Sequence, residues 1–289
     1  MVRKPGPSPL TRRAALAGAL GLAVAAPGAA QAATLPAPPP LPPADVEGRV
    51  AHDGAQIWFA TFGQGPPVIL LHGGLASSDI WGGQLPALLA AGYRVVAIDS
   101  RGHGRSTRDR RPLSYARMET DVVAVMDFLD LEQASVVGWS DGAIIGLIMA
   151  MQDPDRVTRV FAFGANMDVG GLNPLAIFSP MAGPSEALLR AEYVRDTGSA
   201  RGFRALSAAV IRMQLTQPNY TSAELAAIHG PQIAIADGDH DEIISHRHTR
   251  YLARTIPGAE LIWLPHAGHF APLQAPDEFN SAMLDFLGS

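Results

Sequence analysis

Short apolar runs alternate with longer segments of helical period from residue 56 onward, and this alternation limits the possible folds more than any other feature. Six of the runs are predicted strands, at residues 68–71, 95–98, 135–137, 160–163, 233–236 and 261–264. Between two of them, apolar residues recur at intervals of three and four and predict a buried helical stripe: Met118, Val122, Val125, Met126 and Leu129. This pattern predicts an α/β fold with a mostly parallel, doubly wound sheet that helices cover on both faces.

Two regions depart from the alternation. Residues 46–51 and 56–62 are predicted to pair as an antiparallel edge of the sheet. Residues 166–229 contain Gly170-Gly171, several prolines and two helix-forming stretches, but no clear strand. We expect about residues 166–229 to form a small helical cap, inserted after the sixth strand and lying over one end of the sheet.

The N-terminus has the pattern of an export signal. Arg12-Arg13 precedes an uncharged run at residues 14–26, which is too short and too weakly apolar to span a bilayer about 30 Å thick. Small residues at Ala30 and Ala32 suit a cleavage site, so residues 1–32 are predicted to be removed. The arginine pair resembles the bacterial twin-arginine signal, with general secretion and a disordered extension as alternatives. We therefore expect an exported protein, periplasmic or secreted, with no stable membrane span after signal removal.

A proline-rich segment separates this signal from the body. Six prolines lie between residues 36 and 43, a density that favours extended polyproline conformation. Residues 33–45 are therefore predicted to be a linker that acts as a spacer, and residues 46–289 to be the folded domain.

Two residue types are almost absent, and their absence excludes several kinds of chemistry. The single lysine is Lys4, and there is no cysteine. Without lysine in the body, Schiff-base catalysis, pyridoxal-phosphate enzymes and the phosphate-loop lysine are excluded. Without cysteine, thiolate catalysis and cysteine-bound zinc are excluded. Hydroxyl, carboxylate and imidazole groups remain, and we expect no cofactor and no metal.

The charge of the chain argues against one class of partner. Residues 1–32 hold four basic residues and no acid, so their removal takes the net charge from −5 to −9. An acidic body of this kind is a poor candidate for binding nucleic acid. We expect a small-molecule partner instead.

Residues 134–146 carry the pattern of a nucleophile elbow. A short β run enters Gly138-Trp139-Ser140-Asp141-Gly142, and an apolar helical pattern leaves it. The glycines permit the tight turn that exposes Ser140. Since a serine hydroxyl is a weak nucleophile, it needs a base, and the base needs an acid to orient it.

Candidates for both groups follow the last two predicted strands. Asp237, Asp239 and Asp241 follow one of them, and His266 and His269 follow the other. The carboxyl ends of strands form the edge at which open α/β sheets gather their ligands. The chain order of serine, acid and histidine is the order typical of a strand, elbow and helix fold.

Together, these features resemble the α/β-hydrolase superfamily, in its serine-nucleophile, esterase or haloperoxidase-like branch. The matching motifs occur in the expected order: His72-Gly73-Gly74, residues 99–106, the elbow at Ser140, residues 238–241, and Gly268-His269-Phe270. The resemblance implies a catalytic triad of Ser140 as nucleophile, Asp241 as acid and His269 as base. It also implies an oxyanion hole formed by the backbone N–H groups of Gly74 and Asp141, the second of which opens a helix whose dipole favours negative charge.

Alternatives remain within these clusters. Asp239 is the rival acid, and the spacing from Gly238 favours Asp241; His266 is the rival base, expected to be a solvent-facing loop residue. The Asp141 side chain is expected to cap the following helix. Asp99 and His103 are expected to shape a turn. His240, His246 and His248 are poor metal candidates, because His246 and His248 are two residues apart on a predicted helix.

The sequence thus predicts a cofactor-independent serine hydrolase that cleaves a carboxylic ester or related acyl bond. Haloperoxidase or perhydrolase, lactonase and carbon–carbon bond hydrolase activities use the same triad and stay open, as does a non-catalytic exported binding protein. Apolar residues of the cap suggest a largely apolar acyl pocket, although they could equally pack the cap onto the sheet: Met167, Leu172, Leu175, Phe178, Met181, Phe203 and Met213.

Overall fold

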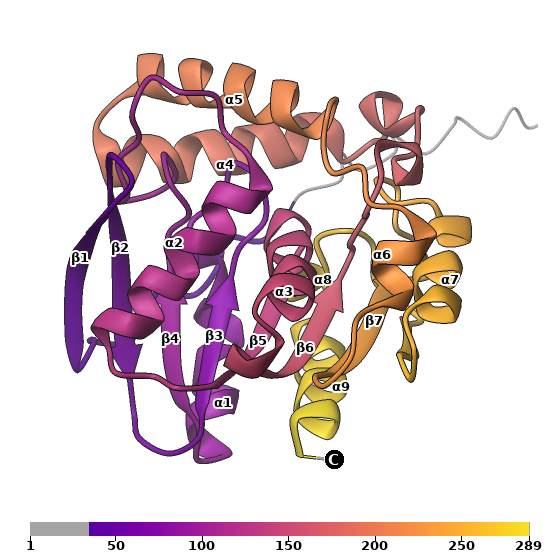
Figure 1. The fold of residues 1–289 in the computed structure, drawn as a ribbon. Coiled ribbons are helices and arrows are strands. Elements are labelled where there is room, and N and C mark those ends of the chain that lie inside the picture. The colour runs from indigo at the N-terminus through magenta and orange to yellow at the C-terminus, as the bar shows by residue number, and fades with distance from the viewer. Residues whose placement is uncertain (1–34, 289) are drawn as a thin grey trace, which may run out of the picture. The chain divides into compact units, whose positions relative to one another are not determined.

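The computed structural model describes residues 35–288, which form an eight-stranded sheet. Figure 1 shows helices on both faces of this sheet. The spatial order of the strands is β1-β2-β4-β3-β5-β6-β7-β8. Their bounds are β1 Val46–His52, β2 Ala55–Phe62, β3 Pro67–Leu71, β4 Arg94–Ile98, β5 Ala134–Trp139, β6 Val157–Phe163, β7 Gln232–Gly238 and β8 Glu260–Leu264. All six strands predicted from residue 68 onward and the predicted doubly wound α/β class are confirmed.

Among the strands of the described residues, β2 alone runs opposite to the others. β1 pairs antiparallel with β2, and β2 pairs antiparallel with β4, which confirms the expected antiparallel edge. The other neighbouring strands run parallel. Parallel strands need a crossover between them, and helices supply it. Consequently the C-terminal ends of β3, β5, β6, β7 and β8 lie along one edge of the sheet.

Helices cover each face and enclose two apolar clusters. Alternate residues of one strand face different clusters, as with Val136 and Val137 of β5, both fully buried. One cluster includes residues of α2 (Tyr115–Phe128), α3 (Asp141–Gln152) and α7 (His246–Thr255). The other includes residues of α1 (Leu85–Ala90), α8 (Ala271–Gln274) and α9 (Pro276–Gly288), together with the 3-10 turn Ser78–Gly83. A further 3-10 turn, Pro154–Arg156, lies between α3 and β6.

The expected cap follows β6, the sixth strand. Between β6 and β7 lie the short turns Val169–Gly171 and Ala176–Phe178, then α4 (Ala182–Thr197), α5 (Ala200–Gln214) and α6 (Ser222–Ala226). Figure 1 shows α4 and α5 crossing above the upper end of the sheet. Phe203 and Met213 of α5 are buried in the two apolar clusters, so α5 packs on the body through one face.

The proline-rich segment differs from the predicted spacer. Residues 35–44 form no helix or strand, but partly buried Leu35, Leu41 and Ala44 pack against the apolar cluster around α9. The carbonyl oxygen of Pro39 lies where a Cβ atom on Gly82 would have to be. The apolar side chains between the prolines therefore hold the segment against the body. The predicted signal peptide, residues 1–32, lies outside the described residues.

Candidate active site

Ser140 lies at the sharp turn between β5 and α3. Its backbone has φ 55° and ψ −119°, a conformation that side-chain-bearing residues rarely adopt. The Ser140 N–H donates to the Phe163 carbonyl at 2.9 Å, which ties the turn to β6. Such strain persists only where the surrounding structure enforces it, and it is typical of functional sites.

The two glycines of the elbow are required by close packing. A Cβ atom on Gly138 would collide with the Gly142 carbonyl, and one on Gly142 would collide with the Leu71 carbonyl of β3. Both obstacles are backbone atoms, which cannot rotate away. The two glycines of the G-x-S-x-G pattern are therefore required by the close packing of α3 on the sheet.

Three side chains from separate loops form one hydrogen-bonded chain. His269, in the loop after β8, places its Nε2 3.0 Å from Ser140 Oγ and its Nδ1 2.7 Å from Asp241 Oδ2. Asp241 follows β7. The structure thus brings together the serine, histidine and acid that the sequence nominated, at distances suited to proton transfer.

The other carboxylate oxygen of Asp241 accepts two backbone hydrogen bonds. Its Oδ1 accepts from the N–H groups of Ile243 and Ile244, each at 2.7 Å. Burial alone would raise the pKa of Asp241, but His269 and these backbone donors outweigh it, and the net pKa is lowered. Asp241 is therefore a buried carboxylate that stays ionised.

The Asp241 charge acts in turn on the imidazole. Burial lowers the pKa of His269, but the Asp241 carboxylate and its hydrogen bond raise it further than burial lowers it. The backbone is fixed as well, because Trp139 Nε1 donates to the His269 carbonyl at 2.7 Å. The result is an oriented base whose Nε2 faces the Ser140 hydroxyl.

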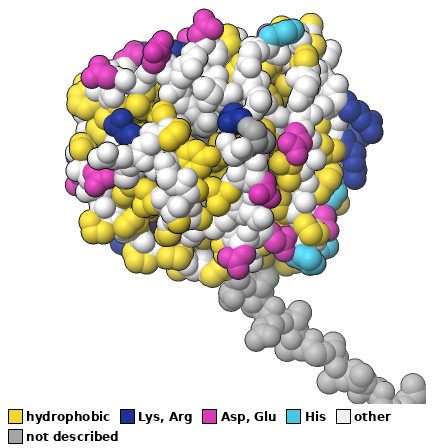
Figure 2. Space-filling model, turned by 90° about the horizontal axis from the view of Figure 1, so that it is seen from below, with side chains coloured by type: hydrophobic (Ala, Val, Ile, Leu, Met, Phe, Trp, Pro, Cys, Tyr) yellow, Lys and Arg dark blue, Asp and Glu magenta, His cyan; other side chains and the backbone are white. Residues whose placement is uncertain are grey.

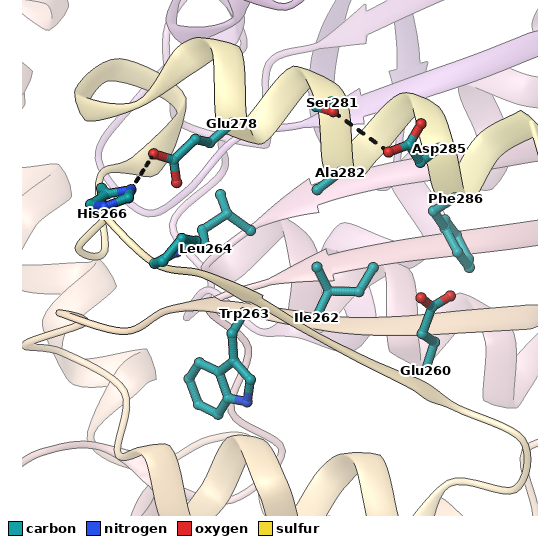
Figure 3. Close-up of a pocket in the computed structure, with 11 residues that line it drawn as sticks. Glu260, Ile262, Trp263, Leu264, His266, Glu278, Ser281, Ala282, Asp285 and Phe286 are labelled. Atoms are coloured by element: carbon teal, nitrogen blue, oxygen red, sulfur yellow. Dashed lines mark hydrogen bonds and ion pairs between the residues drawn. The ribbon is translucent and has the colours of Figure 1, made fainter.

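The rival residues lie elsewhere. Asp239 is exposed, and its Oδ1 is 3.5 Å from His240 Nε2. His266 lines a groove of about 620 Å³ between β8 and α9, where its Nδ1 lies 2.8 Å from Glu278 Oε1 (Figure 3). Ser140, Asp241 and His269 do not line this groove. His266 is therefore the solvent-facing loop residue that was expected.

The loop after β3 is held beside the elbow by a buried histidine. His72 Nδ1 is 2.7 Å from the Gly73 carbonyl, and His72 Nε2 accepts from Ser100 N–H at 3.0 Å. Burial lowers the pKa of His72, so the ring is neutral and donates through Nδ1. A Cβ atom on Gly73 would be 3.1 Å from the Ser140 Cβ, so the loop passes close to Ser140.

Asp99, directly after β4, accepts hydrogen bonds from the segment that follows the β3 loop and from its own loop. Its Oδ1 accepts from Ser78 N–H, and its Oδ2 accepts from Arg105 N–H, both at 2.7 Å. Burial lowers the pKa of neighbouring His103 to about 3. These contacts give Asp99 the turn-shaping position expected of it, away from Ser140.

Comparison with known proteins supplies the family. The chain matches the "Alpha/beta hydrolase family" over residues 68–282. It is 31% identical to a putative carbamate hydrolase, RutD, of Caulobacter sp. (strain K31) over 245 residues, 76% of this chain and 90% of the relative. It is 30% identical to the human serine hydrolase BPHL over 255 residues, 83% and 85% of the two chains. The chain belongs to the α/β-hydrolase family.

Solved structures agree with this assignment. Est816, described as an N-acyl homoserine lactone degrading enzyme, superposes with a TM-score of 0.67 and 28% identity, covering 82% of this chain and 99% of that one. A hydrolase from Pseudomonas aeruginosa PA01 gives a TM-score of 0.67 and 26% identity, covering 86% and 100%. The protein is an enzyme of the α/β-hydrolase fold.

In this α/β-hydrolase, the Asp141 side chain does not cap the helix, and that expectation is wrong. Among the described residues, α3 has no side-chain capping bond. Instead, Asp141 Oδ1 accepts from the Tyr115 hydroxyl at 2.8 Å and from Gln214 Nε2 at 3.0 Å. The tertiary donors turn the carboxyl sideways, toward α2 and α5, and away from the N–H groups of its own helix.

The second oxygen of Asp141 is buried and points at the proposed oxyanion loop. Oδ2 has no hydrogen-bond partner within residues 35–288, and a Cβ atom on Gly74 would be 2.7 Å from it. Burial raises the pKa of Asp141, although Gln214 and Tyr115 partly oppose this. The backbone N–H of Asp141 opens the first turn of α3, where no acceptor exists within the helix.

Asp237, one of the three candidate acids of this α/β-hydrolase, lies beside Asp241, and Thr249, a residue without a predicted role, contacts Asp237. Asp237 is fully buried at the end of β7, where Thr249 Oγ1 donates to its Oδ2 at 2.5 Å. Burial and the neighbouring Asp241 charge raise the pKa of Asp237 well above its usual value, so it is protonated beside an ionised Asp241. Only the three-dimensional contact distinguishes Asp237 from an ordinary strand-end acid.

The histidines considered for a metal have other contacts. His248 Nε2 accepts from Met167 N–H at 3.0 Å, and the His246 ring packs on Trp263. The described part of the chain contains no group of three potential metal ligands. No helix within residues 35–288 is long and apolar enough to cross a bilayer.

Proposed function

We propose that the protein is a serine hydrolase that cleaves a carboxylic ester or related acyl bond of a small, largely apolar molecule. The proposal rests on one observation: the chain from Asp241 through His269 to the strained Ser140, with distances of 2.7 and 3.0 Å. A relay of this kind converts a weak hydroxyl into a nucleophile without a cofactor.

In this mechanism, His269 accepts the Ser140 proton as Oγ attacks the substrate carbonyl. The tetrahedral oxyanion is stabilised by the backbone N–H groups of Gly74 and Asp141. His269 then donates its proton to the leaving alkoxide, which departs as the alcohol and leaves an acyl-Ser140. A water molecule, deprotonated by His269, hydrolyses the acyl-enzyme and releases the acid, while Asp241 stabilises the imidazolium in both steps.

The test compares Ser140→Ala with Ser135→Ala, a serine near the start of the same strand. Turnover of a panel of neutral esters should fall about 10⁴-fold or more in Ser140→Ala and remain unchanged in Ser135→Ala. A fluorophosphonate probe should label the wild type and Ser135→Ala, but not Ser140→Ala. Wild-type hydrolysis by Ser140→Ala would refute the nucleophile, and an unlabelled wild type would favour a binding protein.

A lactone is a second candidate substrate. The 28% identity and full-length superposition with Est816, described as a lactone-degrading enzyme, favour it. A lactone is a cyclic ester, so the same proton transfers apply. Equal kcat/KM for a lactone and its open-chain ester would show no preference for the ring, whereas a 100-fold preference would identify the substrate class.

We also propose that the enzyme is exported after loss of residues 1–32. The arginine pair and the apolar run that follows it support this. Mass spectrometry of the protein from the producing cell should give an N-terminus near Ala33. A retained Met1 in exported protein would contradict the proposal.

A further inference from the structure

An arginine-lined pocket lies where the cap meets the body. It has a volume of about 340 Å³ and lies between the loop before α2 and the helix α5. We call it the arginine pocket and define it by Arg108, Arg110 and Arg111 of the loop and Arg212 of α5. None of its described lining residues is acidic. Leu113, Met213 and two alanines of α5 supply an apolar wall.

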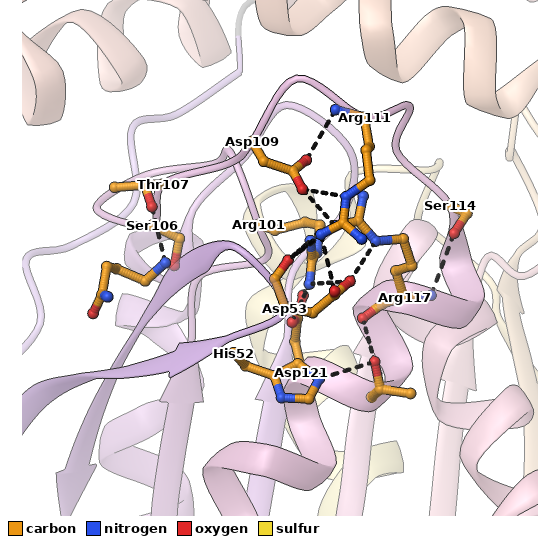
Figure 4. A network of polar contacts seen from close by, with 12 residues as sticks. His52, Asp53, Arg101, Ser106, Thr107, Asp109, Arg111, Ser114, Arg117 and Asp121 are labelled. Atoms are coloured by element: carbon orange, nitrogen blue, oxygen red, sulfur yellow. Dashed lines mark hydrogen bonds and ion pairs between the residues drawn. The ribbon is translucent and has the colours of Figure 1, made fainter.

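The two acidic residues near the pocket already form ion pairs with arginines. Asp109 pairs with Arg111 and with Arg117, and Asp53 pairs with the same two arginines (Figure 4). These contacts compensate the charge of Arg111. The carboxylates of the network are therefore not available to the other arginines of the pocket.

Three arginines of the pocket remain without a carboxylate. Arg108 donates to the Ala205 backbone carbonyl at 3.0 Å, which satisfies a hydrogen bond but not its charge. Arg110 and Arg212 have no hydrogen bond or ion pair from their side chains within residues 35–288. Arg110 and Arg212 are exposed, so their guanidinium donors are accessible to an anion from solvent.

Overall composition does not explain this cluster. Residues 33–289 carry 18 arginines and 27 acids, so acidic partners are in excess. On the face at the opposite end of the sheet from α4 and α5, charged side chains are scattered among apolar ones (Figure 2). The pocket at the cap end nevertheless gathers four arginines and no acid among its described lining residues.

We propose that the arginine pocket binds an oxyanion, the phosphate or carboxylate group of a small molecule. The planar guanidinium fork matches both groups and binds each through paired hydrogen bonds. The apolar wall of Leu113 and Met213 would contact the remainder of such a molecule. Because the arginines come from both the body and α5, the bound anion joins the cap to the body.

This ligand site is separate from the triad, but α5 connects the two. Met213 lines the arginine pocket, and the next residue, Gln214, donates to Asp141 beside Ser140. An oxyanion that fixes the end of α5 therefore also fixes a donor of the catalytic elbow. Binding itself does not depend on the proposed hydrolase activity and can be measured without a substrate.

The experiment measures the melting temperature of the full chain in sodium phosphate, sodium malonate and sodium chloride at equal ionic strength. Phosphate or malonate should raise the melting temperature above the value in chloride, because a ligand of the folded state stabilises it. A rise with phosphate alone would assign a phosphate group, and a rise with malonate alone would assign a carboxylate.

Two double variants of equal charge change decide whether the pocket is responsible. Arg110→Gln with Arg212→Gln should weaken the apparent affinity at least ten-fold, while Arg190→Gln with Arg254→Gln, two exposed arginines elsewhere, should leave it unchanged. Circular dichroism without added anion should match the wild type in both, which shows that both variants fold. An equal rise in both double variants, or no rise over chloride in the wild type, would overturn the proposal.

Discussion

Two buried carboxyl groups flank the Ser140–His269 pair, and they differ in how many donors they meet. Asp241 receives hydrogen bonds at both oxygens, from His269 and from two backbone N–H groups. Asp141 receives two hydrogen bonds, but both reach the same oxygen, and its Oδ2 is unpartnered within the described residues. The pKa of Asp241 is lowered, while that of Asp141 is raised.

The difference shows that burial alone does not set the charge of a carboxyl group. Both side chains are withdrawn from water, with residue exposures of 8% for Asp241 and 5% for Asp141. What separates them is the number of donors and the presence of a cationic partner. Asp241, as a carboxylate, is suited to stabilise an imidazolium. Asp141 is most compatible with a nearby oxyanion when its carboxyl group is neutral. The following changes test this contrast, from the largest expected effect to the smallest.

Asp241→Asn should have the largest effect, lowering kcat/KM about 10⁴-fold. The amide can present its N–H to His269 Nδ1, which selects the wrong tautomer and leaves Nε2 protonated against Ser140. The wild-type kcat/KM should fall as the pH drops through the raised pKa of His269, because only the neutral ring accepts a proton. In the variant this fall should move to lower pH. Asp239→Asn is the control, and an equal loss there would undermine the contrast.

Gly74→Ala should disturb the surroundings of Asp141 and lower kcat about 100-fold. Its new Cβ would lie 2.7 Å from both Asp141 Oδ2 and Gln214 Nε2, so the loop that presents the Gly74 N–H must move. Gly83→Ala is a matched control, since its nearest neighbour would be 3.6 Å away. Steady-state kinetics should show the loss in kcat at a retained melting temperature. Unchanged kcat in Gly74→Ala would remove this loop from the oxyanion hole.

Asp141→Asn should have the smallest effect and the opposite sign. The amide oxygen keeps the bonds from Tyr115 and Gln214, but the variant cannot become negative beside the oxyanion. Two unit charges about 6 Å apart repel by about 1.4 kcal/mol at an effective dielectric of about 40, which corresponds to about ten-fold in rate. Since the wild type acquires this charge as the pH rises through the raised pKa of Asp141, the variant should gain up to about ten-fold in kcat/KM for a neutral ester above that pKa and nothing below it. A loss at all pH values would mean that the carboxylate itself contacts the substrate.

Much of this architecture could be predicted from the sequence, because it depends on local patterns. Short apolar runs specify the strands, and strand ends on one edge bring Ser140, Asp241 and His269 together although they are far apart in the chain. The choice of Asp241 over Asp239 comes from the family resemblance, through the spacing from Gly238, and His269 Nδ1 does lie 2.7 Å from Asp241 Oδ2. These signals lie within a few residues of each site.

The environment of Asp141 could not be predicted in this way. Its partners, Tyr115 and Gln214, are 26 and 73 residues away in the chain, and one belongs to the cap. A helix-opening aspartate usually caps the helix, and only tertiary packing diverts it here. The proline-rich segment shows the same limit: its prolines predict an extended chain, but the packing of Leu35 and Leu41 depends on an apolar surface formed by distant residues.

The backbone conformation of Ser140 has a consequence for evolution and engineering, because the strain at this position opposes stability. A residue with a side chain at φ 55° and ψ −119° stores about 1–3 kcal/mol of strain, which glycine would release. This release is partly offset, because glycine gives the unfolded chain more conformational entropy, which lowers stability by about 0.5–1 kcal/mol. Ser140→Gly should therefore melt at a higher temperature than Ser140→Ala, although both lack the hydroxyl. With Ser140 as the proposed nucleophile, selection for heat tolerance alone would tend to replace it at the expense of activity.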